Sequence, residues 1–318
     1  MGKNRKSAGT LVDRLARFIQ ETSSSLPDDA EQALRKALRR EAKGSSARMV
    51  LETILSNVEL ARAAGTPVCQ DTGTLTFFVS ERLRRRVTPA VLGEAVARAT
   101  ANGWLRRNTI DSVTGRSIDT NVCPGAPVVH YVEVKGEGGK VNGEGGKVNG
   151  ERRTSGPRLS GPAIHPSPFT GRLSLLMKGG GSENMSRQFS LPDASIGAGR
   201  DLEGVRRAVL TAVQQAQGYG CAPGILGVCV GGDRASGYEE AKLQLLRNLA
   251  DVNPDPALAR LERRILREAN SLGIGPMGLG GKTTLLAVKI GARPRVPASF
   301  FVTVAYLCWA ARRRSIAL

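Results

Sequence analysis

Cysteine is the residue type in this sequence with the widest range of possible chemistry, and its spacing narrows that range. The chain has five cysteines, an odd number, and no two of them form a C-x-x-C pair: Cys69, Cys123, Cys221, Cys229 and Cys308. The basic N-terminus leads into an amphipathic pattern and not into the apolar block of an export signal. A disulfide framework is therefore not expected. Buried inert thiols, a catalytic thiolate, or metal ligands from distant segments remain open.

Two glycine clusters have the composition of anion sites. Residues 178–184 read KGGGSEN and residues 278–284 read GLGGKTT, so backbone amides can crowd around an anion with a lysine nearby. Tight turns are the alternative. Residues 273–278 fit G-x-G-x-x-G but follow a helical pattern where a dinucleotide fold needs a strand, and Pro276 occupies the first glycine position of a Walker loop. Nucleotide binding is not expected.

The charge balance leaves the class of partner open. Lysine and arginine number 46 against 28 acidic residues, which gives a net charge of +18, while aromatic residues make up only 4% of the chain. A basic surface attracts nucleic acid, but it also attracts small anions such as dicarboxylates, because electrostatic steering acts on any negative ligand. The arginine runs at 84–86, 152–153 and 312–314 are predicted to be solvent-exposed faces. No apolar run reaches the roughly 18 residues of a membrane span, so a cytoplasmic protein is expected.

Hydrophobic periodicity predicts an α+β fold, a helix-rich N-terminal part packed on a mixed β-sheet core. A polar turn from Val68 should lead into a strand that ends near Val79, and we expect one domain over 1–314. The sequence GEGGKVN occurs twice in succession from Gly136, and the Gly/Pro/Arg-rich stretch 136–172 predicts a disordered insertion. The expected helices lie near 11–19, 28–38, 47–64, 203–217, 237–250 and 257–271, and the further strands near 128–134, 225–230, 285–290 and 300–307.

Five short stretches occur in an order that is typical of one enzyme family. They are CQDTG at 69–73, KGGGSEN at 178–184, GCAPGILG at 220–227, GLGGKTT at 278–284, and the segment 298–309 that contains YLCW. In this series the chain resembles the α-type catalytic chain of the iron–sulfur hydro-lyases, which include class I fumarate hydratase and L-tartrate dehydratase. The resemblance extends from about residue 10 to 314 and lapses over 136–172.

The resemblance implies a 4Fe–4S cluster held by cysteines from three distant loops. The matching positions are Cys69, Cys221 and Cys308. Three thiolates would hold three irons and leave the fourth open to bind a substrate hydroxyl and carboxylate as a Lewis acid. Cys123 and Cys229 match no ligand position and are expected to be small buried or loop thiols.

Further roles follow from the same matches, residue by residue. Asp71 is the candidate for proton transfer with the departing hydroxyl. Arg106 is the candidate clamp for a substrate carboxylate, with Arg107 as its rival if the alignment shifts by one. The remaining predicted substrate-binding residues are Gln70, Gly179, Gly180, Gly181 and Lys282.

The family resemblance implies the α subunit of a hydro-lyase that hydrates fumarate to malate, with tartrate dehydration as the alternative. Because the chain ends soon after the third cysteine, a separate β subunit is expected, in a hetero-oligomer. One departure predicts reduced or altered activity: relatives carry a histidine where this chain has Pro294 between two arginines, and neither His130 nor His165 replaces it. A basic non-catalytic subunit or a nucleic-acid-binding protein is the alternative from another class.

Overall fold

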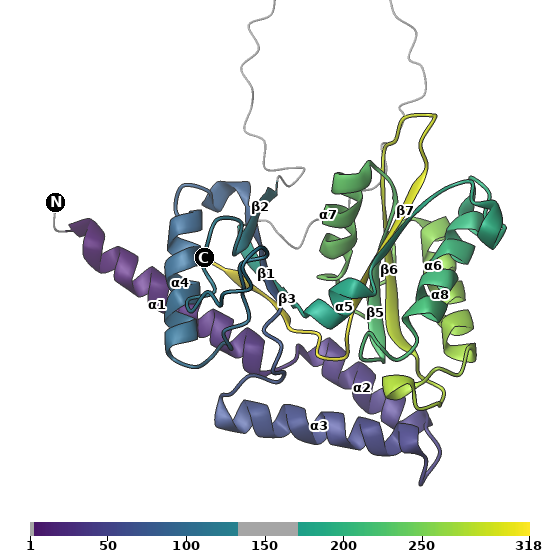
Figure 1. The fold of residues 1–318 in the computed structure, drawn as a ribbon, viewed down its shortest axis with the longest axis horizontal. Helices are drawn as coiled ribbons and strands as arrows, with labels where there is room; N and C mark the ends of the chain where they lie inside the picture. The colour runs from purple at the N-terminus through teal and green to yellow at the C-terminus, as the bar shows by residue number, and fades with distance from the viewer. Residues whose placement is uncertain (1–2, 133–170) are drawn as a thin grey trace, which may run out of the picture.

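Three N-terminal helices open the chain, as the sequence predicts. The structure is a computed structural model that describes residues 3–132 and 171–318, with side chains from Leu11 onward. The helices are α1 (Lys3–Ser24), α2 (Asp28–Arg40) and α3 (Ser46–Ala64) (Figure 1). Acidic residues fill the first turn of α2 and arginines its last, which complements the helix dipole. The Ser45 side chain caps the start of α3, and Gly65 ends it with a φ of 64°.

A first four-stranded sheet packs against two of the helices. Its strand order is β2 (Val128–Val132), β1 (Thr74–Ser80), β3 (Arg172–Lys178) and β8 (Arg313–Ala317). The β1–β2 pair is parallel, and the other two pairs are antiparallel. Helix α1 and the helix α4 (Pro89–Ala101) share one buried apolar cluster with this sheet. A short 3₁₀ turn, η1 (Glu81–Leu83), follows β1.

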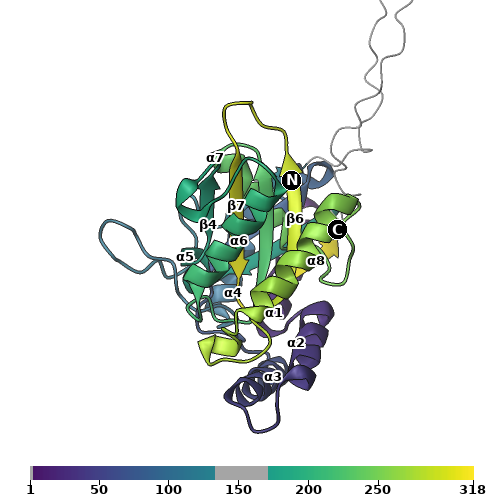
Figure 2. The same ribbon diagram turned by 90° about the vertical axis from the view of Figure 1, so that its right-hand side faces the viewer.

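A second four-stranded sheet forms the other half of the molecule. Its order is β4, β7, β5 and β6, and only the β5–β6 pair is parallel. Helices α6 and α8 cover one face, as Figure 2 shows, and α7 covers the other (Figure 1). The elements of this half are α5 (Gly180–Asn184), β4 (Arg187–Ser190), η2 (Ala194–Ile196), α6 (Leu202–Ala216), β5 (Gly224–Gly231), α7 (Arg234–Gln244), α8 (Pro256–Ser271), η3 (Pro276–Gly278), β6 (Leu285–Arg293) and β7 (Phe301–Leu307).

Several expectations need correction. The fold is α+β with mixed sheets, but there are two sheets where one core was predicted. The helix expected over 237–250 is α7, which begins at Arg234 and ends at Gln244. The arginine run at 312–314 is not a solvated face, because Arg312 is 1% and Arg313 6% exposed. The predicted insertion 136–172 lies outside the described residues apart from Gly171 and Arg172, where β3 begins. Elements that the sequence did not predict are α4, α5, β3, β4 and β8.

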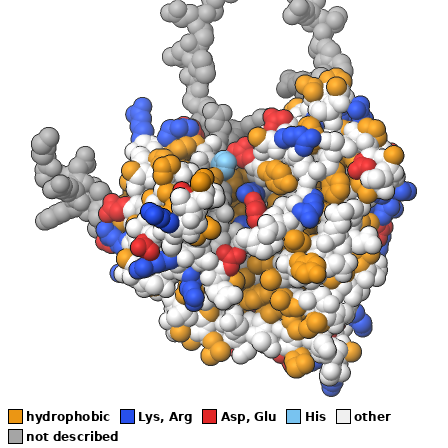
Figure 3. All heavy atoms as spheres, in the orientation of Figure 1, with side chains coloured by type: hydrophobic (Ala, Val, Ile, Leu, Met, Phe, Trp, Pro, Cys, Tyr) orange, Lys and Arg blue, Asp and Glu red, His pale blue; other side chains and the backbone are white. Residues whose placement is uncertain are grey.

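One hydrophobic cluster joins the two halves beneath the point where they meet. It contains side chains of α2 and α3, such as Leu34 and Val58, with Leu176 of β3, Ile225 of β5 and Leu307 of β7. Above it, charged side chains of both signs gather in the hollow between the halves (Figure 3). Strands from both sheets therefore pack on this one hydrophobic cluster. No helix in the described part of the chain is both long and apolar enough to cross a membrane.

Candidate functional site

The loop between α6 and β5 holds Cys221 in an uncommon backbone conformation. Its φ is 55°, in the left-handed region that costs a side-chain-bearing residue about 1–2 kcal/mol. Packing on Tyr306 stabilises the loop, since a Cβ atom at Gly220 or at Gly224 would lie 2.4 Å from the Tyr306 ring. Only glycine lets the backbone approach the ring so closely. The motif GCAPG therefore builds a rigid turn that fixes where the Cys221 thiol lies.

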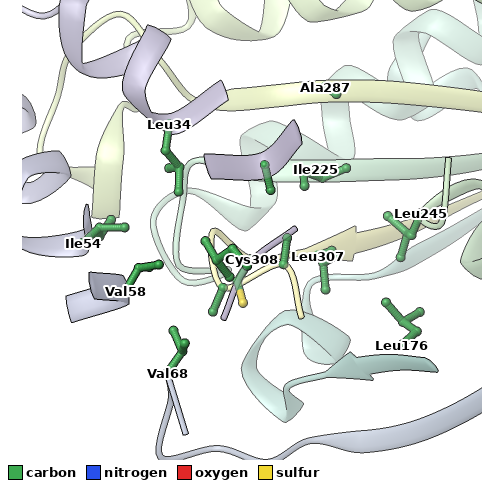
Figure 4. Packing of buried hydrophobic residues seen from close by; sticks show 14 of the residues in the cluster. Leu34, Ile54, Val58, Val68, Leu176, Ile225, Leu245, Ala287, Leu307 and Cys308 are labelled. Carbon is green, nitrogen blue, oxygen red and sulfur yellow. The ribbon is translucent and has the colours of Figure 1, made fainter. Parts of the chain in front are cut away.

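Cys308 follows directly after β7 and lies beside that loop. The Trp309 N–H donates to the Cys221 carbonyl oxygen at 3.1 Å, which ties the two cysteine segments together. Cys308 is 8% exposed and lies next to Leu307, with Val58 of α3 and Val68 nearby (Figure 4). The third cysteine motif thus ends against the second.

Cys69 reaches the same place from the end of α3. The backbone of the preceding residue is held on both sides: the Val68 N–H donates to the Ser23 carbonyl oxygen at 2.9 Å, and Asn57 Nδ2 donates to the Val68 carbonyl oxygen at 2.9 Å. Cys69 and Cys221 are both half-buried and pack against the cluster that contains Cys308. Three cysteines far apart in the sequence therefore converge on one site.

The electrostatics of the thiols reflect this convergence. Burial raises the pKa of Cys308 to about 11, although the Arg312 guanidinium acts in the opposite direction, and the nearby Cys221 and Cys69 thiols raise it further. Burial also raises the pKa of Cys221, with contributions from Cys69 and Asp71. The three thiols are thus close enough to influence one another.

The other two cysteines stand apart, as predicted. Cys229 is fully buried in β5, and burial raises the pKa of its thiol to about 12. Its sulfur lies 3.8 Å from the Gly231 carbonyl oxygen, which accepts its hydrogen bond. Cys123 lies half-buried in the loop before β2. Neither thiol contributes to the pKa shifts of the converging group.

The motifs CQDTG and KGGGSEN pack closely against each other around Asp71, and we call this contact the joint around Asp71. The Gly180 N–H donates to Asp71 Oδ2 at 2.7 Å, and a Cβ at Gly179 would lie 2.8 Å from the same oxygen. Gly73 has a φ of 72°, and a Cβ there would lie 2.3 Å from the Lys178 carbonyl oxygen. The Gly180 N–H, which was predicted to face substrate, donates its hydrogen bond to Asp71 in this structure. That hydrogen bond orients the half-buried carboxylate.

Arg106 lies beside the same turn because its backbone is bonded to Thr72. Thr72 Oγ1 accepts from the Arg106 N–H at 2.8 Å and donates to the Arg106 carbonyl oxygen at 2.9 Å. The Arg106 side chain is exposed and, within the described residues, forms no ion pair. Arg107, its rival, pairs with Asp119 at 3.5 Å. Of the two arginines, Arg106 is the one whose guanidinium is available to a ligand. Gln70, next to Cys69, is exposed as well.

The second glycine cluster already holds an anion of this chain. The Lys282 N–H donates to both carboxylate oxygens of Glu41 at 3.0 Å, and Glu41 is 5% exposed. A Cβ at Gly281 would lie 2.6 Å from the Ala47 Cβ, so the loop packs against the first turn of α3. The Glu41 carboxylate thus occupies the backbone anion site that was expected here. The Lys282 side chain stays exposed.

Lys178 ends β3 beside the converging cysteines, and its charge is balanced locally. It is 1% exposed, forms an ion pair with Glu183, and donates to Ser186 Oγ at 3.0 Å. Burial lowers the pKa of Lys178 to about 8, while the Glu183 carboxylate opposes that shift. Glu183 therefore pairs with Lys178 and also with Lys242, the latter at 2.9 Å, so the buried Lys178 has a carboxylate partner within the chain.

Sequence reasoning missed two polar groups of this site. All three guanidinium nitrogens of Arg312 and the hydroxyl of Tyr306 are buried without a hydrogen-bond partner. Both side chains are 1% exposed, and the charge of Arg312 and the hydroxyl of Tyr306 both lie within electrostatic reach of Cys308. The only sequence signal was their position: Tyr306 lies two residues before Cys308, and Arg312 lies four residues after it. Unpartnered buried polar atoms of this kind are rare and mark a place where a further group fits.

Comparisons with known proteins agree with the motifs. A family model described as fumarate hydratase (fumerase) matches residues 12–143 and 153–317. The chain is 42% identical over 311 residues to a Geobacillus stearothermophilus protein provisionally named fumarate hydratase class I, covering 96% of this chain but 54% of that protein. It is 30% identical over 310 residues to a Methanocaldococcus jannaschii protein provisionally named L(+)-tartrate dehydratase subunit alpha, with 95% of each covered. Identity to the L(+)-tartrate dehydratase subunit alpha of Escherichia coli K12 is 26% over 314 residues, which are 98% of this chain and 91% of that one. The chain thus spans about half of the first relative and nearly all of the two alpha subunits.

Proposed function

Because this chain belongs to the fumarate hydratase (fumerase) family, we propose that it is the α subunit of a hydro-lyase that hydrates fumarate to malate. The identity to a protein named for fumarate favours that substrate. L-Tartrate is the second candidate, favoured by the near-complete coverage of two alpha subunits named for tartrate. Those names also support a β subunit as the partner of this chain in a hetero-oligomer.

Cys69, Cys221 and Cys308 would hold a 4Fe–4S cluster in this enzyme. Their thiols converge, and the buried donors of Arg312 and Tyr306 next to them suit an anionic guest. Among the described residues no group of three or more His, Cys, Asp or Glu side chains is placed to hold a metal ion. The proximity of the three thiols and the buried donors beside them support a cluster at this place. Such a cluster supplies an open, Lewis-acidic iron for a substrate hydroxyl.

The chain's own residues bind and orient the substrate around that centre. The Arg106 guanidinium would pair with one substrate carboxylate in the bidentate manner that arginine favours. Asp71, held by the Gly180 N–H at 2.7 Å, would exchange a proton with the departing or entering hydroxyl at its free carboxylate oxygen. Gln70 lies beside both the first cysteine and this carboxylate and would donate to the substrate. The β subunit would supply the remaining carboxylate contacts and the base for the carbon-bound proton.

The convergence of the three cysteines carries this proposal, and iron analysis tests it. The full chain is purified and reconstituted anaerobically with iron and sulfide, beside Cys221→Ser and the matched control Cys229→Ser. We expect about four irons per chain in the wild type and in the control, and a loss of iron and of the visible absorption in Cys221→Ser. A wild-type chain that takes up no iron would show that the cluster assignment is wrong.

Assays with the β subunit then separate the two substrates. The reconstituted pair is given fumarate and L-tartrate in parallel, together with an Asp71→Asn variant that keeps its iron. We expect fumarate hydration by the wild type and a loss of about 10²–10⁴-fold in Asp71→Asn, the usual contribution of a positioned proton donor or acceptor. Turnover of L-tartrate alone would replace the first candidate with the second.

A further inference from the structure

Backbone hydrogen bonds fix the position of Arg312, and its buried side chain has no hydrogen-bond partner among the described residues. Its N–H donates to the Ala310 carbonyl oxygen at 2.7 Å, and its carbonyl oxygen accepts from the Met177 N–H at 2.9 Å. The side chain is 1% exposed and is the largest of the fully buried side chains among the described residues. None of its three guanidinium nitrogens has a hydrogen-bond partner. The fold therefore carries a buried cation that the described chain leaves unsatisfied.

Such an arrangement is unfavourable unless another group completes it. An arginine guanidinium stays charged in proteins, and removing it from water without a counter-charge is strongly destabilising. The neighbouring Arg313 shows the ordinary solution, because its guanidinium pairs with Asp29 at 2.6 Å. No ion pair of Arg312 exists within the residues that the structure describes. An anionic guest would satisfy Arg312.

The surroundings of Arg312 show where that guest would lie. The guanidinium acts on the thiol of Cys308, four residues earlier in the chain. Its Nη2 lies 3.9 Å from the position that a Cβ of Gly179 would occupy, so it also reaches the joint around Asp71. Lys178, the other buried cation in reach of Cys308, already pairs with Glu183. Arg312 is thus the uncompensated positive charge at the converging cysteines.

We propose that Arg312 is a positioning residue for the cluster, donating its N–H groups to cluster sulfur and to the Cys308 thiolate. The inference rests on the proposed function, because it needs a cluster at the three cysteines. Three thiolates give a 4Fe–4S cluster a net negative charge, which the buried guanidinium offsets. A substrate carboxylate is the less suitable partner, since it arrives from solvent and Arg312 is closed off from solvent while Arg106 is not.

Hydrogen bonds to cluster sulfur have known consequences. They raise the reduction potential of a cluster and hold it in place. Without a cluster the same guanidinium only opposes folding, because it is buried and unpaired. Arg312 should therefore stabilise the loaded chain and destabilise the empty one, which a merely structural side chain would not do.

The test compares Arg312→Met and Arg312→Lys with Arg313→Met, in the full chain reconstituted anaerobically. We expect Arg312→Met to lower the reduction potential of the cluster and to speed iron loss to a chelator about 10–100-fold, the usual effect of removing an outer-shell partner. Arg312→Lys, which keeps the charge but loses the fork, should fall between. In the cluster-free chain, Arg312→Met should unfold at the wild-type temperature or above. Arg313→Met should lower the unfolding temperature of both forms and leave the potential unchanged.

The failures of the two proposals are distinguishable. Wild-type chain that binds no iron would overturn both. Wild-type chain with a full cluster beside an Arg312→Met variant of unchanged potential and iron retention would overturn the role of Arg312 alone. A variant with an unaltered cluster and only a raised KM for the dicarboxylate would overturn it too, in favour of substrate binding. If Arg312→Met does not fold with its cluster, the same measurements on Arg312→Lys decide.

Discussion

Two buried arginines in this chain have opposite surroundings. Arg247, after α7, is 6% exposed and donates to Asp251, to Glu262 at 2.9 Å and to Gln244 at 3.0 Å. Arg312, after β7, is 1% exposed and donates to nothing in the described chain. Carboxylates of the described chain thus pair with the guanidinium of Arg247, and none of them pairs with that of Arg312.

The difference indicates that Arg247 stabilises the fold itself, whereas Arg312 is placed to bind a group from outside the described chain. Around Arg247 the charges close into a network: Lys289 Nζ donates to Asp251, Asn253 Nδ2 donates to Glu262 at 2.8 Å, and the Ile290 N–H donates to Glu262 at 2.7 Å. Networks of this kind are complete once the chain folds. The Arg312 guanidinium influences the Cys308 thiol, but no hydrogen-bond partner for it exists among the described residues.

The largest expected effect is on stability, at Arg247. Arg247→Met removes the cation that pairs with two carboxylates, one of them the buried Glu262, which is 7% exposed. Breaking a buried ion pair leaves an uncompensated charge and costs about 3–5 kcal/mol. We expect that loss in the free energy of unfolding by urea of the cluster-free chain, whereas Arg312→Met measured in the same way should lose none. Equal losses in the two variants would end the comparison.

A smaller effect is expected for two tyrosine hydroxyls, one from a strand of each sheet. Tyr306 is 1% exposed and its hydroxyl has no partner, whereas the Tyr131 hydroxyl donates to the Val87 carbonyl oxygen at 3.0 Å. In the cluster-free chain, Tyr306→Phe should leave the free energy of unfolding unchanged or raise it by up to about 1 kcal/mol, because a buried unsatisfied group is removed. Tyr131→Phe is the matched control and should lose about 1 kcal/mol. A loss in Tyr306→Phe as large as that of the control would indicate a partner within the chain.

Sequence predicted the parts of the site that depend on local backbone chemistry. Helix α3 ends at Gly65 and the turn at Gly73 needs a positive φ, so both boundaries follow from residue type. Two of the three cysteine motifs, CQDTG and GCAPG, sit in short turns that contain glycine, whereas YLCW contains none. That these turns meet is a tertiary fact, and only the serial resemblance to a family predicted it.

The parts that sequence did not predict depend on contacts between distant residues. Strand β3 reads RLSLLMK with six of its seven residues buried, so it lacks the alternation that identifies a strand with one wet face. Strand β8 begins in the arginine run, and its Arg313 is buried because Asp29 lies 284 positions earlier in the chain and pairs with it. Nothing in three consecutive arginines distinguishes the one that pairs with an aspartate from the one whose guanidinium has no partner among the described residues.

The smallest expected effect is a pH dependence of the free energy of unfolding, which arises in the ion-pair network around Arg247 and is not expected from Arg312. Burial opposes ionisation of Asp251, but its bonds to Arg247 and Lys289 dominate and hold the pKa of that carboxyl below its ordinary value. The folded chain therefore binds this proton less readily than the unfolded chain, so the stabilisation is complete above the ordinary Asp range and is lost as pH falls through the folded pKa. In urea titrations of the cluster-free chain, Asp251→Asn should be less stable than the wild type at pH 7, and the gap should close as the solution is acidified. The exposed Asp119→Asn is the control and should show no such gap. Since no carboxylate among the described residues pairs with Arg312, Arg312→Met should leave this acid limb as it is in the wild type, and a changed limb would mean that Arg312 has an acidic partner in the folded chain.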